Sequence, residues 1–228
     1  MVVDDIKENL RSQPLPKYSR GEETFNWVSH LIGVVFGLVT LVIAIVFTIQ
    51  KPYTWTESLS LFFYAFSMIF LYANSTIYHL LNKKQTLKKL FRLIDHNTIY
   101  FLIAGTYAPI CAFAFKGTNI GIIIFLIEIA GLLLGTILNI FNLNGKITKV
   151  VTVVLYVVMG WAIVFYYPAL AMLDFKALLF VLLGGISYTA GVLFYVVGKK
   201  KKWMHSVFHL FVLVGTLLQF VGILFIVI

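Results

Sequence analysis

The last apolar stretch of the chain opens with two histidines, His205 and His209, in the segment Trp203-Met204-His205-Ser206-Val207-Phe208-His209. On a helix, residues four apart share one face, with roughly 5–6 Å between their Cβ atoms. Two imidazoles at that spacing can bind one metal ion. Polar groups at the mouth of so apolar a helix are costly, so they are usually paired or functional. The pair therefore predicts a site to which other parts of the chain contribute further groups.

The elements that must position this pair are membrane-spanning helices. Of the 228 residues, 61% are hydrophobic and only 12% are charged, and the mean hydropathy is +0.95. A soluble domain of this length carries more charge and less apolar mass. The apolar stretches are too long and continuous for the alternating strands of a membrane barrel. We therefore predict an all-α, polytopic membrane protein whose surroundings are the lipid bilayer.

The chain divides into a polar cytoplasmic tail, residues 1–22, and a seven-helix transmembrane domain, residues 23–228. Because the first two dozen residues are polar and of mixed charge, we expect no cleavable signal and expect the first apolar stretch to direct insertion. Each predicted span has close to the ~20 residues that a helix needs to cross a bilayer. The predicted spans are 25–48, 57–81, 94–115, 119–141, 149–166, 175–197 and 204–228.

The charged residues of the loops predict the orientation of these spans. With the N-terminus inside, fifteen of the eighteen Lys and Arg residues fall in inside segments, and only Lys51, Lys116 and Lys176 fall outside. This asymmetry follows the positive-inside rule and predicts a cytoplasmic N-terminus and an outside C-terminus. We therefore also predict a multi-pass protein of the cell (plasma) membrane, which would be the inner membrane of a bacterium. The inside set includes the predicted second loop, with Lys83, Lys84, Lys88, Lys89 and Arg92, and the cluster 199–202.

The net charge of +9 has the same explanation, so we predict no nucleic-acid partner. The single cysteine, Cys111, excludes an internal disulfide and a thiolate metal cluster.

All five histidines fall in the predicted cytoplasmic half of the bilayer, on four helices. A single histidine there would usually make an interhelical hydrogen bond. Five at one depth favour a metal site instead. His205 and His209 supply two ligands and His79 a third, whereas His30 and His96 could be ligands or supporting groups.

Asp95 lies beside His96 at the predicted inner end of the third span. A carboxylate entering the membrane requires a cation or strong donors. It could pair with Arg92 on the same helix face, or it could bind or orient a metal-bound water. Ser75 lies four residues before His79 and shares its face, so it could hold the same water or bond to its own helix. Three imidazoles and a water make a catalytic type of Zn²⁺ site, with a hydroxide nucleophile available near neutral pH.

Four segments carry polar motifs at the predicted inner ends of the spans: Glu23-Thr24-Phe25-Asn26-Trp27-Val28-Ser29-His30, Ser75-Thr76-Ile77-Tyr78-His79, Arg92-Leu93-Ile94-Asp95-His96 continuing to Pro109, and His205-Ser206-Val207-Phe208-His209. Together they resemble the hemolysin III-like branch of the progestin and adipoQ receptor (PAQR) superfamily. Each segment alone is a weak signal, but their combination across the membrane core is specific. Where many bacterial members have a further histidine late in the last span, this chain has Gln219.

The resemblance implies a seven-helix bundle that holds zinc near its cytoplasmic face through His79, His205 and His209. A water completes the zinc shell, held by Asp95 with Ser75 close by. Supporting roles are implied for His30 and His96, and we assign them also to Arg92, Asn26 and Glu23. Eukaryotic relatives are hormone receptors linked to ceramide hydrolysis, the superfamily includes alkaline ceramidases, and bacterial relatives are associated with membrane lipid homeostasis. The long N-terminal domain of the receptors has no counterpart here, so hormone reception is not implied.

Glu128 is a separate polar feature, because it lies inside the predicted fourth span. An acid at this depth lines a proton or substrate path, or it is neutral and hydrogen-bonded to another helix. Gly131 and Gly135 follow it at the four-residue spacing of close helix packing within the bundle.

Our first functional hypothesis is a zinc-dependent membrane hydrolase of a lipid amide or ester, with a ceramide-like amide as substrate, Asp95 as base and Ser75 as a stabiliser of carbonyl charge. The first alternative is a non-enzymatic sensor or transducer in which zinc is structural. The second alternative, a pore-forming cytolysin, rests only on the family name.

Overall fold

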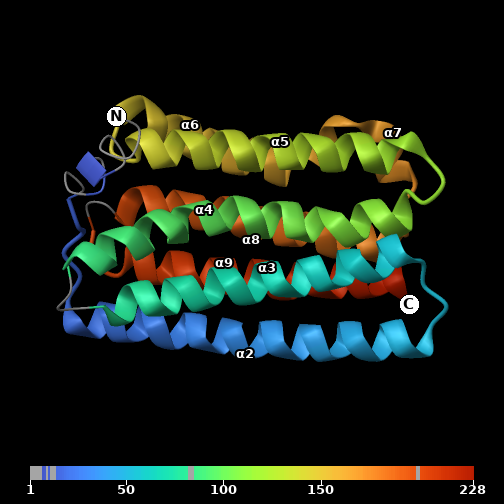
Figure 1. Ribbon diagram of the computed structural model, residues 1–228, viewed down its shortest axis with the longest axis horizontal. Helices are drawn as coiled ribbons and strands as arrows, with labels where there is room; N and C mark the ends of the chain where they lie inside the picture. The colour runs from blue at the N-terminus through green and yellow to red at the C-terminus, as the bar shows by residue number, and fades with distance from the viewer. Residues whose placement is uncertain (1–6, 9, 11–13, 82–84, 199–200) are drawn as a thin grey trace.

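The computed structural model describes residues 7, 8, 10, 14–81, 85–198 and 201–228. Its main elements are long α-helices that lie side by side along the long axis of the molecule, as Figure 1 shows. No strand occurs among the residues it describes. The helices are α2 (Arg20–Gln50), α3 (Trp55–Leu80), α4 (Gln85–Pro109), α5 (Asn119–Asn142), α6 (Lys146–Gly160), α7 (Tyr167–Ala171), α8 (Phe175–Gly198) and α9 (Met204–Val227).

Six of the described helices are long and apolar enough to cross a membrane: α2, α3, α4 with its extension to Ala114, α5, α8 and α9. The predicted span 149–166 differs, because α6 has only 15 residues and ends at Gly160. The chain continues as a 3₁₀ helix, Ala162–Phe165, and then α7. Figure 1 shows α6 near one end of the bundle and α7 near the other. The seventh crossing therefore stays a prediction. It would be formed by α6, the 3₁₀ helix and α7 together, as an interrupted helix.

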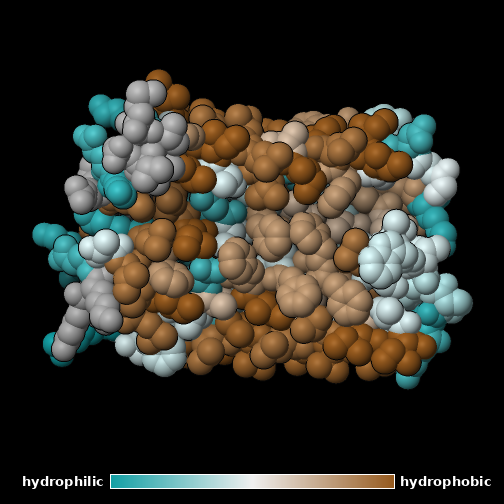
Figure 2. All heavy atoms as spheres, viewed as in Figure 1, coloured by the Kyte–Doolittle hydropathy of each residue, from teal (hydrophilic) through white to brown (hydrophobic). Residues whose placement is uncertain are grey.

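The outer surface of the bundle is apolar over most of its length. Figure 2 shows hydrophobic residues across the middle of one face and hydrophilic residues at both ends. On α2, the side chains of Ile32, Val35 and Val42 are 56%, 56% and 58% exposed. Such a continuous apolar surface is favourable in lipid and costly in water. The chain is thus a multi-pass membrane protein.

Capping residues define where α2 and α3 begin. Ser19 caps α2, with its backbone N–H donating to Glu22 Oε2 at 2.8 Å and its hydroxyl accepting from the Glu22 N–H at 3.3 Å. Thr54 and Glu57 form the same reciprocal arrangement at the start of α3. A Ser or Thr followed three residues later by Glu satisfies backbone donors that the first turn leaves free.

The predicted loop before the third span is partly wrong. Helix α4 begins at Gln85, so Lys88, Lys89 and Arg92 lie on the helix and not in a loop. Burial explains the difference, because Lys88 is only 6% exposed and its ammonium pairs with Glu23. An ion pair with a carboxylate offsets the cost of burying the lysine ammonium, so Lys88 can lie on a packed helix. Several residues of the predicted tail and basic loops lie outside the described part: residues 1–6, 9, 11–13, 82–84 and 199–200.

Close packing between helices depends on glycine at a few positions. A methyl group added at Gly135 on α5 would overlap the Tyr100 ring of α4, and one at Gly131 would lie 2.7 Å from Met159 Sδ of α6. Both glycines therefore pack within the bundle, as their spacing predicts.

Candidate metal centre

Three histidines from opposite halves of the sequence meet at the end of the bundle where α3 ends and α9 begins. One ligand atom from each of His79, His205 and His209 can be chosen so that all lie within 4.8 Å of one another. The Nε2 atoms of His205 and His209 face each other at 3.1 Å. The rings of His79 and His209 have centroids 5.0 Å apart. The four-residue spacing on α9 thus produces the predicted pair, and tertiary packing adds His79.

The hydrogen-bonding state of these imidazoles fits a metal ion. His79 and His209 are 0% and 1% exposed. Within the described structure, His79 Nε2 and His209 Nδ1 are buried without a hydrogen-bond partner. Because buried polar atoms are almost always satisfied, the unpartnered Nε2 of His79 beside the close Nε2 atoms of His205 and His209 fits three ligands to one cation. The residues present could therefore hold a metal.

Glu23 and Lys88 orient one of the three histidines. Glu23 Oε2 lies 2.6 Å from His79 Nδ1, and Glu23 Oε1 accepts from Lys88 Nζ at 2.5 Å. Since the carboxylate is an acceptor, Nδ1 carries the imidazole proton and leaves Nε2 free for a metal. Asn26 is fully buried beside them, with Nδ2 3.5 Å from the same His79 Nδ1. Glu23 and Asn26 thus lie beside the triad, and their supporting roles stay a prediction.

Asp95 and Ser75 line the same cavity as His205 and His209. Ser75 is 1% exposed, and its Oγ makes no hydrogen bond to any residue described. The ion pair considered for Arg92 and Asp95 is not formed within 4.0 Å in this part of the chain; Arg92 instead donates to the Pro14 carbonyl at 3.1 Å. Asp95 and Ser75 are therefore available to a molecule in the cavity.

His30 and His96 occupy different environments. The His30 ring stacks on His209 with centroids 3.7 Å apart, and both His30 nitrogens are buried without partners among the described residues. His96 Nδ1 lies 2.9 Å from the Arg92 carbonyl, and its Nε2 lies 3.2 Å from the Tyr195 hydroxyl. His30 therefore belongs to the histidine cluster, whereas His96 takes part in packing α4 against α8.

Tyr18 is a site residue that the sequence patterns did not predict. It precedes α2, and its ring stacks on His205 at 4.9 Å between centroids, with an interplanar angle of 17°. Burial raises the pKa of its hydroxyl, so the group stays protonated and can donate a hydrogen bond. Nothing in the motif spacing distinguishes Tyr18, because its position depends on how the segment before α2 folds over α9.

A cavity of about 360 Å³ leads from the histidines into the bundle. Its walls come from α2, α3, α4, α6, α8 and α9 and from the segment before α2, and they include Trp161 and Gln219 far from the histidine end. Gln219 donates to the Val181 carbonyl at 2.9 Å, so it serves to pack α9 against α8. The volume and the apolar depth suit a small amphiphile or an acyl chain.

Glu128 lies apart from this centre. It is 0% exposed, and neither of its carboxylate oxygens has a hydrogen-bond partner among the residues described. Its side chain does not line the cavity. The structure therefore separates Glu128 from the histidine site.

Known proteins match most of this chain. The sequence profile described as Haemolysin-III related matches residues 18–220. The chain is 36% identical over 205 residues to the Hemolysin-3 homolog of Bacillus subtilis (strain 168), covering 90% of this chain and 93% of that protein. It is 32% identical to Hemolysin-3 of Bacillus cereus, covering 90% and 91%. It is also 27% identical to the human Monocyte to macrophage differentiation factor, covering 73% and 70%.

Proposed function

Since this chain belongs to the haemolysin-III-related family of membrane proteins, we propose that it is a zinc-dependent hydrolase of a lipid amide or ester. A ceramide-like amide is the first candidate substrate. One observation carries the proposal: ligand atoms of His79, His205 and His209 lie within 4.8 Å of one another, beside a cavity that Asp95 and Ser75 also line. Nucleophile activation, proton transfer and carbonyl binding need these groups in one place.

The donor set favours zinc among the divalent metals. Three neutral imidazoles with an open fourth position are typical of catalytic zinc. When bound, zinc lowers the pKa of a coordinated water to about 7 and so supplies a hydroxide nucleophile near neutral pH. Glu23 and Lys88 keep the His79 ring in the tautomer and orientation that such a site needs.

The remaining steps belong to residues of the cavity wall. Hydrolysis adds the hydroxyl of water to the acyl carbon and its proton to the departing nitrogen or oxygen. Asp95 accepts the proton at its carboxylate and returns it to the leaving group. The Ser75 hydroxyl, which has no partner among the described residues, donates to the carbonyl oxygen as negative charge develops there. The apolar depth of the cavity holds the acyl chain and excludes water from it.

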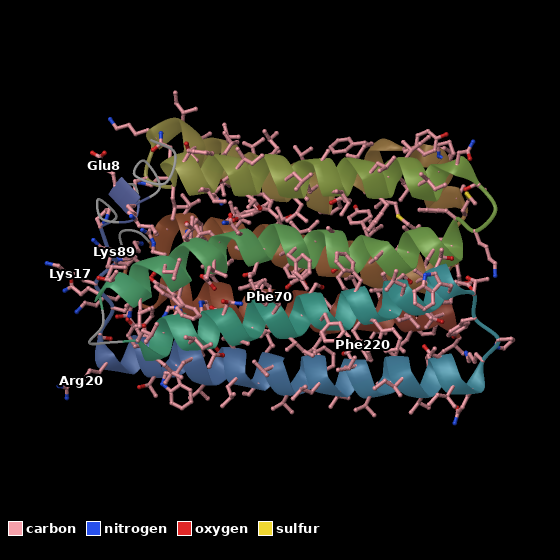
Figure 3. The ribbon with its side chains drawn as sticks, in the orientation of Figure 1. Glu8, Lys17, Arg20, Phe70, Lys89 and Phe220 are labelled. Carbon is pink, nitrogen blue, oxygen red and sulfur yellow. The ribbon has the colours of Figure 1, made fainter. Side chains whose placement is uncertain are left out.

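We place the histidine end of the bundle at the cytoplasmic face of the plasma membrane, as in a bacterial inner membrane. The basic residues at that end, including Lys17, Arg20 and Lys89 in Figure 3, support this orientation. The site would then act on lipids of the inner leaflet, in keeping with a role in membrane lipid homeostasis.

Purified protein and labelled lipid amides and esters test the proposal. We expect turnover by the wild type, loss after zinc chelation and recovery on adding zinc. Asp95→Asn preserves shape and should lower the rate by about 10²–10⁴-fold while zinc stays bound. Leu210→Ala, at a lipid-facing position beside His209, is the matched control. No turnover by the zinc-loaded wild type, or equal turnover after His209→Ala, would contradict the proposal.

A second candidate, a sensor or transducer with structural zinc, is favoured by His30. Its ring stacks on His209 and its two nitrogens have no partner among the described residues, so rotation of the ring out of this stack could provide a fourth ligand that leaves no place for water. X-ray absorption of the zinc-loaded protein distinguishes the two functions. Four imidazoles around zinc would support a sensor, and three with one oxygen would support a hydrolase. Cytolytic activity rests only on the names of the relatives, and a haemolysis assay tests it.

A further inference from the structure

The cavity opens at the histidine end among four basic side chains. Lys17, Arg92, Lys201 and Lys202 all line it. The three lysines are exposed, as residues at the inner end of a membrane protein often are. What separates these four from other basic residues at this end is their position on the cavity wall, which directs their charge into the space above the histidines.

Arg92 is the one member of this set that is buried. It is 9% exposed, and its only hydrogen bond in the described structure is the one from Nη1 to the Pro14 carbonyl. A guanidinium has five N–H donors and stays charged. None of its nitrogens is among the buried side-chain atoms that lack a partner in the described structure, so the remaining donors are accessible to an anion in the cavity. Its fork geometry matches the two oxygens of a phosphate or carboxylate.

The nearby carboxylates do not supply that anion. Glu22 accepts from the backbone N–H groups of Ser19 and Trp203, at 2.8 and 2.7 Å. Glu23 is occupied by His79 and Lys88. Asp95 forms no ion pair with Arg92 within 4.0 Å among the residues described. The mouth therefore keeps a positive excess.

The position of Arg92 also indicates how the anion is connected to an acyl chain. Arg92 and Asp95 lie three residues apart on α4, a rise of about 4.5 Å along the helix. An anion at Arg92 is thus a few bonds from a carbonyl at Asp95. A phosphate joined to an acyl group through a short spacer, such as glycerol, could contact both side chains, and its chain would extend into the cavity.

We propose that the cavity binds a single-chain lipid whose phosphate headgroup is held by Arg92, with Lys17, Lys201 and Lys202 around it. The headgroup class rests on the geometry of the mouth, and only the cleavage of such a lipid rests on the proposed hydrolase function. A neutral lipid would leave the Arg92 charge without a counter-ion, so the site discriminates by headgroup charge.

Binding of two non-hydrolysable lipids tests the proposal without any turnover. One is an alkyl ether of glycerol 3-phosphate, and the other is the same alkyl glycerol without phosphate. Each competes with a fluorescent lipid for protein in a maltoside detergent. We expect the wild type to bind the phosphate lipid at least tenfold more tightly. Arg92→Gln should remove most of this preference and leave the affinity for the neutral lipid unchanged, while Arg92→Lys should keep part of it.

Two further variants distinguish a loss of headgroup binding from misfolding of Arg92→Gln. Lys201→Gln/Lys202→Gln leaves the Pro14 contact intact and should lower the preference by a smaller factor. Lys146→Gln/Lys149→Gln removes two charges from the same end but outside the cavity lining, and should change nothing. Equal binding of the two lipids by the wild type, or equal loss of both in Arg92→Gln, would overturn the proposal.

Inorganic phosphate distinguishes a lipid headgroup from a soluble anion. We expect it to compete at least a hundredfold more weakly than the phosphate lipid, and equal competition would overturn the lipid assignment. Headgroup preference without hydrolysis of any ester would support this inference and contradict the hydrolase. Metal-dependent hydrolysis without headgroup preference would support the hydrolase and contradict this inference.

Discussion

Each histidine of the metal centre is held by a different neighbour. Glu23 fixes His79 through Nδ1, Tyr18 stacks on His205, and His30 stacks on His209. A metal gains affinity when its ligands are already oriented, because less rotational freedom is lost on binding. Of these neighbours, Glu23 acts most directly, since its contact also determines which nitrogen is free.

Replacing Glu23 should therefore lower the affinity for the metal and have little effect on the fold. We expect Glu23→Gln to lower zinc affinity by about 10–100-fold, because the amide cannot hold the imidazole proton as the carboxylate does. Competition with a zinc-chelating dye in detergent measures this. Glu8→Gln removes an exposed carboxylate and is the control. Equal zinc affinities for the wild type and Glu23→Gln would show that Glu23 plays no part in the centre.

At the scale of elements, helices α4 and α5 approach closely where small residues face large rings. Gly135 packs against Tyr100, whose side chain is buried at 0% exposure. A polar contact forms across the same interface, because Asn139 donates to Asn97 at 2.8 Å, and Asn139 also accepts from Thr152 of α6 at 2.9 Å. In lipid, such packing and hydrogen bonds replace the hydrophobic effect as the force between helices.

Gly135→Ala should destabilise the bundle by about 1–3 kcal/mol, since the new methyl group overlaps the Tyr100 ring and the helices must move apart. Thermal unfolding in detergent measures the loss as a lower melting temperature. Gly160→Ala is the matched control, because a methyl group there meets no atom within 4 Å. A melting temperature for Gly135→Ala as high as that of Gly160→Ala would contradict this account of the interface.

At the scale of the whole molecule, the number of crossings determines which side each terminus faces. Six described helices meet the length of a membrane span, and the segment from α6 through α7 is the remaining candidate. An even number of crossings would leave both termini on one side. An odd number separates them, as the loop charges predict.

Single cysteines can decide this topology. Cys111 is buried and the chain has no other cysteine, so Cys111→Ala provides the background. We expect an impermeant maleimide to label Ile228→Cys and Tyr167→Cys from outside intact cells, and Lys146→Cys only after permeabilisation. Tyr167 and Ile228 are 77% and 81% exposed, so access is not limited by packing. Labelling of Tyr167→Cys and Lys146→Cys from the same side would show that α6 does not cross.

Local sequence determined much of this protein. Continuous apolar stretches determined the helical membrane class, the Ser19 and Thr54 capping patterns specified two helix starts, and the spacing of His205 and His209 put them on one face. Each of these features depends on residues that lie close together in the sequence, so a sequence pattern is enough to predict it. The start of α4 was missed because the polar residues there resemble a loop until Lys88 is seen to pair with Glu23.

Only the tertiary structure decided which distant groups share the site. The stacking of Tyr18 on His205, the Glu23 contact to His79 and the contact of Arg92 with the Pro14 carbonyl all join residues far apart in the sequence. Their distances depend on how helices pack in three dimensions, which no local pattern encodes. The same packing left Glu128 outside the cavity, although its type and depth alone made it a candidate.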